Sequence, residues 1–564
     1  MRKSVTITLL CIIICNIIVA QKSNKNHSEI ERPKLVVGII VDQMRWDYLY
    51  RYYNKYKTGG FKRLLNEGFS CENSMINYIP TVTAIGHTTI FTGSVPSIHG
   101  IAGNEWIDTK TGKSIYCTDD STVQTVGVEG KSGKMSPHYL LATTITDELR
   151  LATNFQSKVV GVSLKDRAAI LPAGHNPTAA FWIDDASGKF ISSTYYLKTL
   201  PQWAIDFNDS KPVDKLLSKG WNTLLPIEEY SESTADNVSW EGAMKGTTNS
   251  VFPYDAQKAY AADHGALRQM PFGNTLTLQF AQTAIDGYKL GQENTTDFIS
   301  VNCASTDYSG HLVGPNAIEI EDIYLRLDKD LADFFSYLDK KVGKDNYLLF
   351  LTADHGAAHA EGFMKEYKMP TGLLSNSLAK NLEDGLNKQF GKEKLLFTID
   401  NFQVVFDKVR IDSLHLDYEK IKTFTVNYLQ QQDGIQYAVD QDKISEASIP
   451  TPLKEMMING YNYHRSGSVL IVPLPGWLPG NSKKGTTHTV WNPYDTHIPL
   501  VFMGWNIPHG VTNRIIQMTD ISATLAALLH IQMPSGCIGT PIPEVLNKKD
   551  NSANWPAIEW PLNN

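Results

Sequence analysis

Cysteine is scarce in this chain, at 6 of 564 residues, and no two cysteines are spaced as Cys-x-x-Cys. That spacing is typical of structural zinc sites, so the sequence argues against thiolate-bound zinc. Cys11 and Cys15 lie in an N-terminal segment that we expect to be removed. The four that remain are Cys71, Cys117, Cys303 and Cys537. Four cysteines allow three full pairings, and the sequence does not choose among them. Cys303 sits in an apolar run and could instead be a buried thiol.

The chain also lacks an excess of positive charge. Its 52 Lys and Arg residues against 59 Asp and Glu residues give a formal net charge of −7. Proteins that bind nucleic-acid duplexes carry a basic footprint, so we expect no such partner. A phosphorylated ligand would have to be held by a few local charges or by metals. No internal repeat or low-complexity tract is evident, and the 42% hydrophobic content is ordinary for a globular chain with a large core.

A run long enough to span a membrane is missing at the N-terminus. The apolar run from about Val5 to Val19 falls short of the ~20 residues that a spanning helix needs. Arg2 and Lys3 precede the run and Ala20 follows it, which is the arrangement of a secretory signal peptide. We therefore predict that residues 1–20 are a signal peptide. The mature protein would be exported, either periplasmic or secreted, without a stable membrane span. A membrane anchor or a buried helix is the alternative.

Continuous apolar runs recur along the rest of the chain and alternate with helical patterns. The runs are Lys34–Val41, Val159–Val162, Phe298–Cys303, Tyr347–Thr352 and Ile498–Met503. Such runs are typical of strands that are buried on both faces. One helical pattern covers Asp322–Leu338. Strands that alternate with helices predict an α/β fold, with a mostly parallel central sheet and helices on both faces.

The stretch 361–485 has a different pattern. It contains strand-like segments at Leu395–Ile399, Gln403–Phe406 and Ile435–Val439, a helical segment at Tyr418–Gln431, and a loop rich in Pro and Gly at Pro473–Lys484. We interpret it as a smaller α+β subdomain inserted into the sheet domain. The predicted organisation is therefore a linker at 21–34, a main domain formed by 35–360 and 486–564, and an insertion at 361–485.

Acidic and imidazole side chains gather near the predicted strand ends, where α/β enzymes hold their ligands. The set comprises Asp42, Asp307, His311, Asp354, His355 and His488. One helical turn would place Asp307 and His311 on the same side, because they are four residues apart. Asp354 could alternatively cap a helix. Mixed imidazole and carboxylate ligands suit zinc, and suit manganese less well, so the set predicts a site for two metal ions.

Thr83 lies in a segment that resembles the start of a helix. Pro80 is followed by threonines and then by an apolar pattern, and the segment ends at Gly93. The hydroxyl of Thr83 would then lie in the positive field of the helix N-terminus. A plain threonine N-cap is the alternative. His87 comes one turn later, and we interpret it as a hydrogen-bonded helix residue and not as a ligand.

Together these motifs resemble the alkaline phosphatase superfamily, and most closely the phosphate-irrepressible alkaline phosphatases of the Bacteroidetes, the PafA type. The motifs in chain order are Asp42, Thr83 within Pro-Thr-Val-Thr-Ala-Ile-Gly-His, Asp307-x-x-x-His311, Asp354-His355-Gly356 and His488 within Gly-Thr-Thr-His. The Asn, Lys and Arg that contact phosphate in that family match Asn104 in Gly-Asn-Glu-Trp, and Lys165 and Arg167 in Ser-Leu-Lys-Asp-Arg. The resemblance covers essentially the whole mature chain.

The resemblance implies a phosphate monoester hydrolase that needs two zinc ions per chain and acts on a broad range of small phosphomonoesters. By this resemblance, one zinc is held by Asp42, Asp354, His355 and Thr83, and the other by Asp307, His311 and His488. Thr83 would be the nucleophile and form a phosphothreonine intermediate. Asn104, Lys165 and Arg167 would neutralise the non-bridging oxygens of the phosphoryl group.

Three alternative functions fit the sequence less well. A nucleotide pyrophosphatase/phosphodiesterase of the same superfamily would share the metal ligands and Thr83, but we expect it to lack the Lys165 and Arg167 pair. A sulfatase would need Cys or Ser in a Cys/Ser-x-Pro-x-Arg context, whereas Thr83 is followed by Ala-Ile-Gly. A non-catalytic binding protein would not need the complete ligand set. The physiological substrate, the oligomeric state and regulation by phosphate do not follow from the sequence.

Overall fold

Five parallel strands form the centre of the largest sheet in the computed structural model, which describes residues 30–392, 394–480 and 482–546. In order across the sheet they are β10 (Tyr347–Thr352), β1 (Leu35–Val41), β9 (Asp297–Cys303), β6 (Val159–Ser163) and β7 (Ala179–Asp184). Each neighbouring pair is parallel. All seven residues of β1 are buried, as its unbroken apolar sequence predicts.

The outer strands of this 11-stranded sheet pair mostly antiparallel. They are β2 (Phe69–Met75), β5 (Thr125–Val126), β8 (Lys189–Ser193), β17 (His497–Ile498), β18 (Leu500–Gly504) and β19 (Gly510–Gln517). β18 runs antiparallel to β10 and to β2, and β8 runs antiparallel to β7, whereas β19 is parallel to β2. The predicted α/β class is confirmed, and its parallel part is the middle of the sheet.

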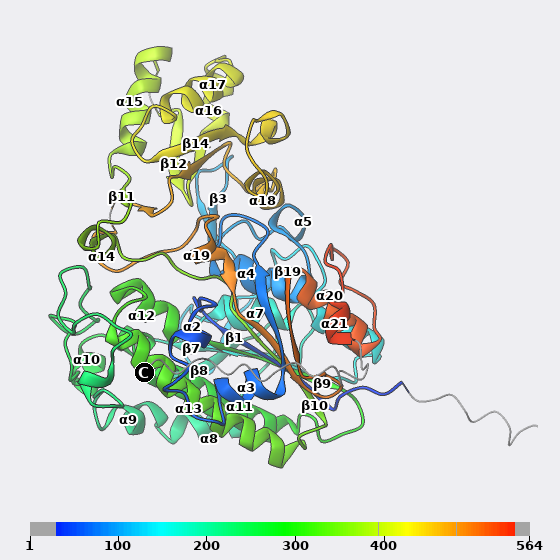
Figure 1. Cartoon of the computed structure of the whole chain (residues 1–564). Helices are drawn as coiled ribbons and strands as arrows, with labels where there is room; N and C mark the ends of the chain where they lie inside the picture. The colour runs from blue at the N-terminus through cyan, green and yellow to red at the C-terminus, as the bar shows by residue number, and fades with distance from the viewer. Residues whose placement is uncertain (1–29, 393, 481, 547–564) are drawn as a thin grey trace, which may run out of the picture. The chain divides into compact units, whose positions relative to one another are not determined.

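Helices cover both faces of the sheet (Figure 1). On one face lie α4 (Thr83–Thr92), α6 (Ile145–Ala152), α7 (Asp166–Ala173) and α20 (Asp520–Leu529), and on the other α3 (Phe61–Glu67), α11 (Phe272–Tyr288) and α13 (Ile318–Lys341). The predicted helix at Asp322–Leu338 is the central part of α13. α4 is buried along its whole length, so both its first turn and its last lie inside the protein.

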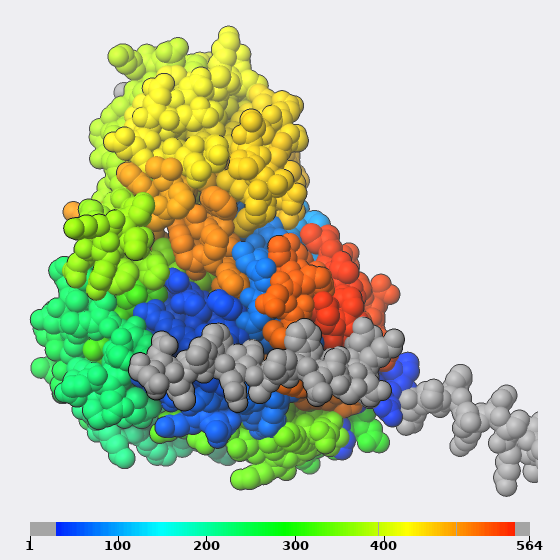
Figure 2. All heavy atoms as spheres, in the orientation of Figure 1, coloured from blue at the N-terminus to red at the C-terminus, as the bar shows by residue number. Residues whose placement is uncertain are grey.

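A second sheet lies within the stretch that we predicted to be an insertion. Its strands are β12 (Leu396–Asp400), β13 (Gln403–Phe406), β15 (Val469–Pro473) and β14 (Ile435–Asp440), and its main helices are α15 (Leu378–Phe390), α17 (Tyr418–Leu429) and α18 (Leu453–Gly460). A core of its own, with Leu382, Phe406 and Ile421 fully buried, joins the sheet to α15 and α17. In the space-filling view its yellow atoms gather as one body (Figure 2). The boundaries 361–485 remain a prediction.

The predicted signal peptide and most of the predicted linker lie outside the described residues, so export stays a prediction. None of the helices in the described ranges has both the length and the apolar character that a membrane crossing requires. The four cysteines whose pairing the sequence left open are free thiols: Cys71, Cys117, Cys303 and Cys537. Cys303 is fully buried on β9, as the apolar run around it indicated.

The close approach of α7 to β6 depends on glycine. A Cβ atom at Gly161 would overlap the backbone oxygen of Ala169 in α7. We therefore expect Gly161→Ala to lower the free energy of unfolding by about 1–3 kcal/mol, because the helix must move away from the strand. Gly385→Ala is the matched control, since its Cβ would meet only ordinary contacts at 3.4 Å or more. Alanine is also preferred to glycine inside a helix. Urea denaturation tests the pair, and equal midpoints for the two variants would contradict the account.

Candidate active site

The ends of three central strands carry the predicted acidic residues to one edge of the sheet. Asp42 follows β1, and Asp354 comes two residues after the end of β10. Asp307 lies in the first turn of α12 (Ser305–Val313), which begins two residues after β9. β1 and β9 are in register at Val41 and Cys303, so their carboxyl ends lie side by side. Parallel pairing therefore brings together three carboxylates that are far apart in the sequence.

Asp42, Asp354 and His355 bring three potential metal-ligand atoms close together. The Nε2 atom of His355 lies 3.4 Å from Oδ2 of Asp354 and 3.8 Å from Oδ1 of Asp42. All three of these atoms are buried and have no hydrogen bond within the described structure. Buried polar atoms are nearly always paired, so three unpaired ligand atoms at such distances fit a divalent cation. The Nδ1–H group of His355 donates to the oxygen of Gly356 at 2.9 Å, which turns the lone pair of Nε2 toward the carboxylates.

Asp307, His311 and His488 form a second group, with ligand atoms within 4.8 Å of one another. Both imidazoles use Nδ1 to donate to a backbone oxygen, that of Thr486 for His311 and that of Thr81 for His488. Their Nε2 atoms lie 3.2 Å and 3.9 Å from Oδ1 of Asp307. Backbone tethering of Nδ1 is the usual way in which metal-binding histidines are oriented.

The two groups are neighbours. The rings of His355 and His488 stack with their centroids 3.6 Å apart. Ligand atoms of Asp42, Asp307 and His355 also lie within 4.8 Å of one another. Asp307 of the second group is therefore close to two members of the first. The structure thus brings together all six predicted Asp and His residues. Ligand atoms of Asp42, His87 and Asp354 also lie within 4.8 Å of one another, so the division of the six residues between two metal ions remains a prediction.

Thr83 is the first residue of α4, and Val82 occupies the cap position. The cap residue is Val82, whose side chain makes no capping hydrogen bond, so the alternative of a plain threonine N-cap does not hold. Oγ1 of Thr83 lies 3.4 Å from the Nζ atom of Lys165. His87 donates from Nδ1 to the oxygen of Thr83 at 3.0 Å, as expected for a helix residue. The same atom lies 3.4 Å from Oδ2 of Asp354, which adds a contact to the first group.

Lys165 places a buried positive charge beside the carboxylates of the site. It is 1% exposed, and its Nζ atom lies 2.8 Å from Oδ2 of Asp42 and 2.7 Å from Oδ2 of Asp307. Lys165 is therefore a buried residue of the site and not part of a solvated turn. Although burial opposes it, the carboxylates of Asp307 and Asp42 raise the pKa of Lys165, so the ammonium stays charged.

Arg167 and Asn104 both follow Thr83 in the sequence and are held by different contacts. Arg167 is half-buried, donates from Nη1 to the hydroxyl of Tyr116 at 3.0 Å, and keeps a buried Nε–H without a partner. The Oδ1 atom of Asn104 accepts from the backbone N–H of Ala84 at 2.9 Å, which fixes its amide beside the start of α4. Both side chains retain N–H groups that could contact an anion.

Three residues that contact the site were not predicted from the sequence. Gln43 donates from Nε2 to Asp307 at 2.7 Å and from its backbone N–H to Asp354 at 3.1 Å, so it connects two carboxylates. Asn302, a polar residue inside the apolar strand β9, donates to Asp42 at 3.4 Å. Tyr116 holds Arg167. The sequence did offer a signal for Gln43 and Asn302, because each is a polar residue at the end of an apolar strand or inside one. Nothing in the sequence near Tyr116 indicates its role.

Burial and neighbouring charges shift the pKa values of the residues in the site. Burial and the neighbouring Asp354 raise the pKa of Asp42. The carboxylate of Asp307 is also buried, but Lys165 and then His311 lower its pKa well below the usual range. Burial, with the nearby His355 and His311 rings, lowers the pKa of His488. Neutral imidazoles and ionised carboxylates are the forms that bind metals, so the shifts of Asp307 and His488 favour metal binding. The pKa values of Asp42 and His311 are raised, which favours their protonated forms.

Comparisons with known proteins agree with this geometry. The family model described as type I phosphodiesterase / nucleotide pyrophosphatase matches residues 36–499. Alkaline phosphatase PafA of Elizabethkingia meningoseptica is 56% identical over 95% of this chain and 98% of that protein. Alkaline phosphatase PhoV of Synechococcus elongatus is 52% identical over 96% of this chain and 100% of that protein.

A crystal structure of wild-type PafA superposes with a TM-score of 0.91 and 57% sequence identity, and the match covers 92% of this chain and 100% of that one. The chain belongs to the type I phosphodiesterase / nucleotide pyrophosphatase family of the alkaline phosphatase superfamily and, within it, to the PafA-type alkaline phosphatases, as its motifs predicted.

Proposed function

We propose that the protein hydrolyses a broad range of phosphate monoesters through a phosphothreonine intermediate at a site for two zinc ions. The observation that carries the proposal is the meeting of unpartnered atoms of Asp42, Asp354 and His355 close to Lys165, which contacts Thr83. A monoester dianion needs its charge neutralised before it can be attacked. Two divalent cations and a buried ammonium beside one hydroxyl supply that neutralisation.

Asp42, Asp354 and His355 would hold one zinc ion, with Thr83 as a further ligand. Asp307, His311 and His488 would hold the other. Bound zinc would supply Lewis-acid stabilisation of the attacking and leaving oxygens.

Residues of the chain carry out the remaining steps of phosphoryl transfer. Thr83 loses its hydroxyl proton to solvent and its Oγ1 attacks phosphorus. The new Oγ1–P bond forms, and the bond from phosphorus to the alcohol oxygen breaks. The alcohol leaves with a proton from solvent. Water then attacks phosphorus, the Oγ1–P bond breaks, and inorganic phosphate leaves while Thr83 recovers its proton. Lys165, 3.4 Å from Oγ1, favours the deprotonated hydroxyl, and Asn104 and Arg167 donate to the non-bridging oxygens.

A phosphodiesterase is the second candidate, because the matching family model is named for that activity. Lys165 and Arg167 argue for the monoester. A diester carries one negative charge less and offers one unsubstituted oxygen less to these two cations.

Metal removal tests the cofactor. Purified protein should contain two equivalents of zinc by mass spectrometry of the metals. A chelator should abolish monoester hydrolysis, because the ligand set has no other source of comparable positive charge, and added zinc should restore it. Full activity in a rigorously metal-free preparation would contradict the proposal.

Replacement of Thr83 tests the nucleophile. Thr83→Ala should lower kcat by orders of magnitude, while Thr83→Ser should retain much of the activity because the hydroxyl remains. Acid quenching with labelled substrate should place phosphate on Thr83. Thr88→Ala, five residues along the same helix, is the matched control and should remain active. Label on a different residue would require another nucleophile.

The double variant Lys165→Ala with Arg167→Ala tests the choice between monoester and diester. It should lower kcat/KM for a monoester by orders of magnitude and for the matched methyl diester far less, since charge-assisted hydrogen bonds to the extra oxygen are lost. Arg167→Lys should not restore a bidentate contact. The ratio of the two substrates within one preparation cancels partial misfolding or metal loss. An equal fall for both would mean that the pair supports the site in general, and a wild-type preference for the diester would favour the phosphodiesterase.

A further inference from the structure

Tyr116 is the last residue of β4 (Ser114–Tyr116), which pairs antiparallel with β3 (Glu105–Ile107) in a short hairpin. Its hydroxyl oxygen accepts a hydrogen bond from Nη1 of Arg167 at 3.0 Å and donates one to Oδ1 of Asp166 at 2.9 Å. Chemistry fixes the direction of both bonds, because a guanidinium can only donate and an ionised carboxylate can only accept. One hydroxyl therefore links Arg167 to the acid beside it in the sequence.

A second hydroxyl holds Asp166 from the same stretch of chain. Oγ1 of Thr118, which is fully buried, donates to Oδ2 of Asp166 at 2.6 Å. Each oxygen of Asp166 thus has its own hydroxyl donor. Burial raises the pKa of Tyr116 well above its usual value, and the nearby Asp166 adds to the rise, so the hydroxyl keeps the proton that it donates.

The hairpin also holds Asn104. β3 begins directly after Asn104, and the backbone N–H of Cys117 donates to the backbone oxygen of Asn104 at 2.9 Å. Tyr116, which precedes Cys117, accepts from Arg167. Two neighbouring residues of the chain thus hold in place the two residues that would donate to non-bridging oxygens of the substrate.

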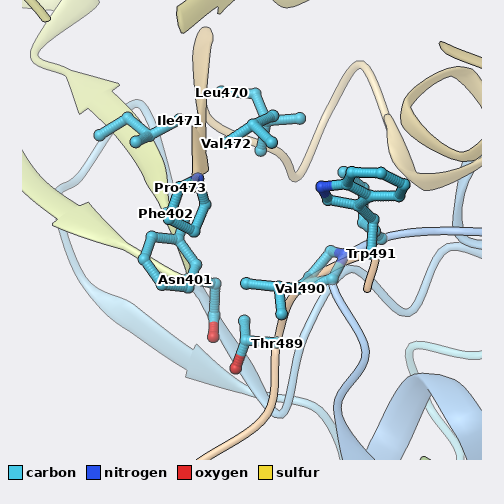
Figure 3. Close-up of a pocket in the computed structure, with 11 residues that line it drawn as sticks. Asn401, Phe402, Leu470, Ile471, Val472, Pro473, Thr489, Val490 and Trp491 are labelled. Atoms are coloured by element: carbon cyan, nitrogen blue, oxygen red, sulfur yellow. The ribbon is translucent and has the colours of Figure 1, made fainter. Parts of the chain in front are cut away.

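Close contacts with the second sheet restrict the position of the hairpin. A Cβ atom at Gly112, in the turn of the hairpin, would lie 2.7 Å from the ring of Phe397 in β12. A Cβ atom at Gly103, at the base of the hairpin, would lie 3.2 Å from Nδ2 of Asn401. Asn401 lies in the turn between β12 and β13, where it also lines a small pocket (Figure 3). Tyr116 is therefore carried by an element that has neighbours at its base and at its turn.

Arg167 is held by a neutral oxygen, whereas Lys165 directly contacts two carboxylates. Among the described residues, Arg167 forms no ion pair with a carboxylate. A carboxylate in direct contact would compete with the substrate for the guanidinium, because charge-assisted pairs with carboxylate and with phosphate use the same N–H groups. The oxygen of Tyr116 fixes the guanidinium without such competition.

We propose that Tyr116 is a positioning residue for the reaction: its hydroxyl, directed by Asp166, fixes the guanidinium of Arg167 at a set place relative to Asn104. The inference rests on the proposed function, in which Arg167 donates to a non-bridging oxygen. Tyr116 would act only through Arg167. Its hydroxyl should therefore matter most for monoesters, which offer Arg167 the extra unsubstituted oxygen.

Tyr116→Phe tests the proposal in the zinc-loaded enzyme. The variant should lower kcat/KM for a monoester roughly tenfold, as expected for the loss of one hydrogen bond to a charged group. Inhibition by inorganic phosphate should weaken by a similar factor, and kcat/KM for the matched methyl diester should fall less. In an Arg167→Ala background the same replacement should change kcat/KM by less than about twofold, because no guanidinium is left to position. Equal losses in the two backgrounds would overturn the proposal.

Tyr196→Phe is the matched control. Tyr196 is also half-buried and packs against the apolar residues of α7, but its buried hydroxyl has no hydrogen-bond partner within the described structure. The control should leave kcat/KM and inhibition by phosphate as in the wild type. A loss equal to that of Tyr116→Phe would assign the effect to packing around α7 and overturn the proposal.

A second pair of variants tests the part assigned to Asp166. The amide in Asp166→Asn can donate as well as accept, so it no longer fixes the direction of the Tyr116 hydroxyl. In that background Tyr116→Phe should cost only about threefold in kcat/KM, because the two residues act as one unit. An undiminished tenfold loss would overturn the role of Asp166. Failure of the proposed function is distinguishable, because Arg167→Ala alone would then leave monoester hydrolysis unchanged.

Discussion

Concentrated negative charge inside the protein is the constraint on which this structure depends. Asp42, Asp307 and Asp354 are each no more than 4% exposed and lie at one edge of the central sheet. Burying charges is costly unless they are paired. Lys165 contacts two of the three carboxylates, so one ammonium faces three acids. Two divalent cations would reverse this imbalance, and the site would then attract a phosphate dianion.

The rest of the fold positions that charge. Parallel pairing of β1 with β9 and β10 makes three separate stretches of sequence end together. Backbone oxygens orient His355, His311 and His488, so the rings do not depend on a metal for their direction. Gly161 lets α7 approach the sheet closely, and this helix carries Arg167 and begins directly after Lys165. The geometry for phosphoryl transfer is thus built into rigid elements.

Much of this could be predicted from the sequence because each part has a local signal. Apolar runs that end in Asp or His identify strands with ligands at their ends, and the start of α4 was visible at Pro80. Contacts between distant segments had no such signal. Tyr116 reaches Arg167 from a short strand 51 residues earlier. The apolar runs also gave no indication that the outer strands of the sheet pair mostly antiparallel.

The central claim is that the buried carboxylates and imidazoles hold two zinc ions beside Thr83. Anomalous diffraction from crystals, recorded on both sides of the zinc absorption edge, tests it most directly. The account predicts two peaks, one within ligand distance of Asp42, Asp354 and His355 and the other within ligand distance of Asp307, His311 and His488. A single peak, or zinc bound away from these six residues in an active enzyme, would contradict it.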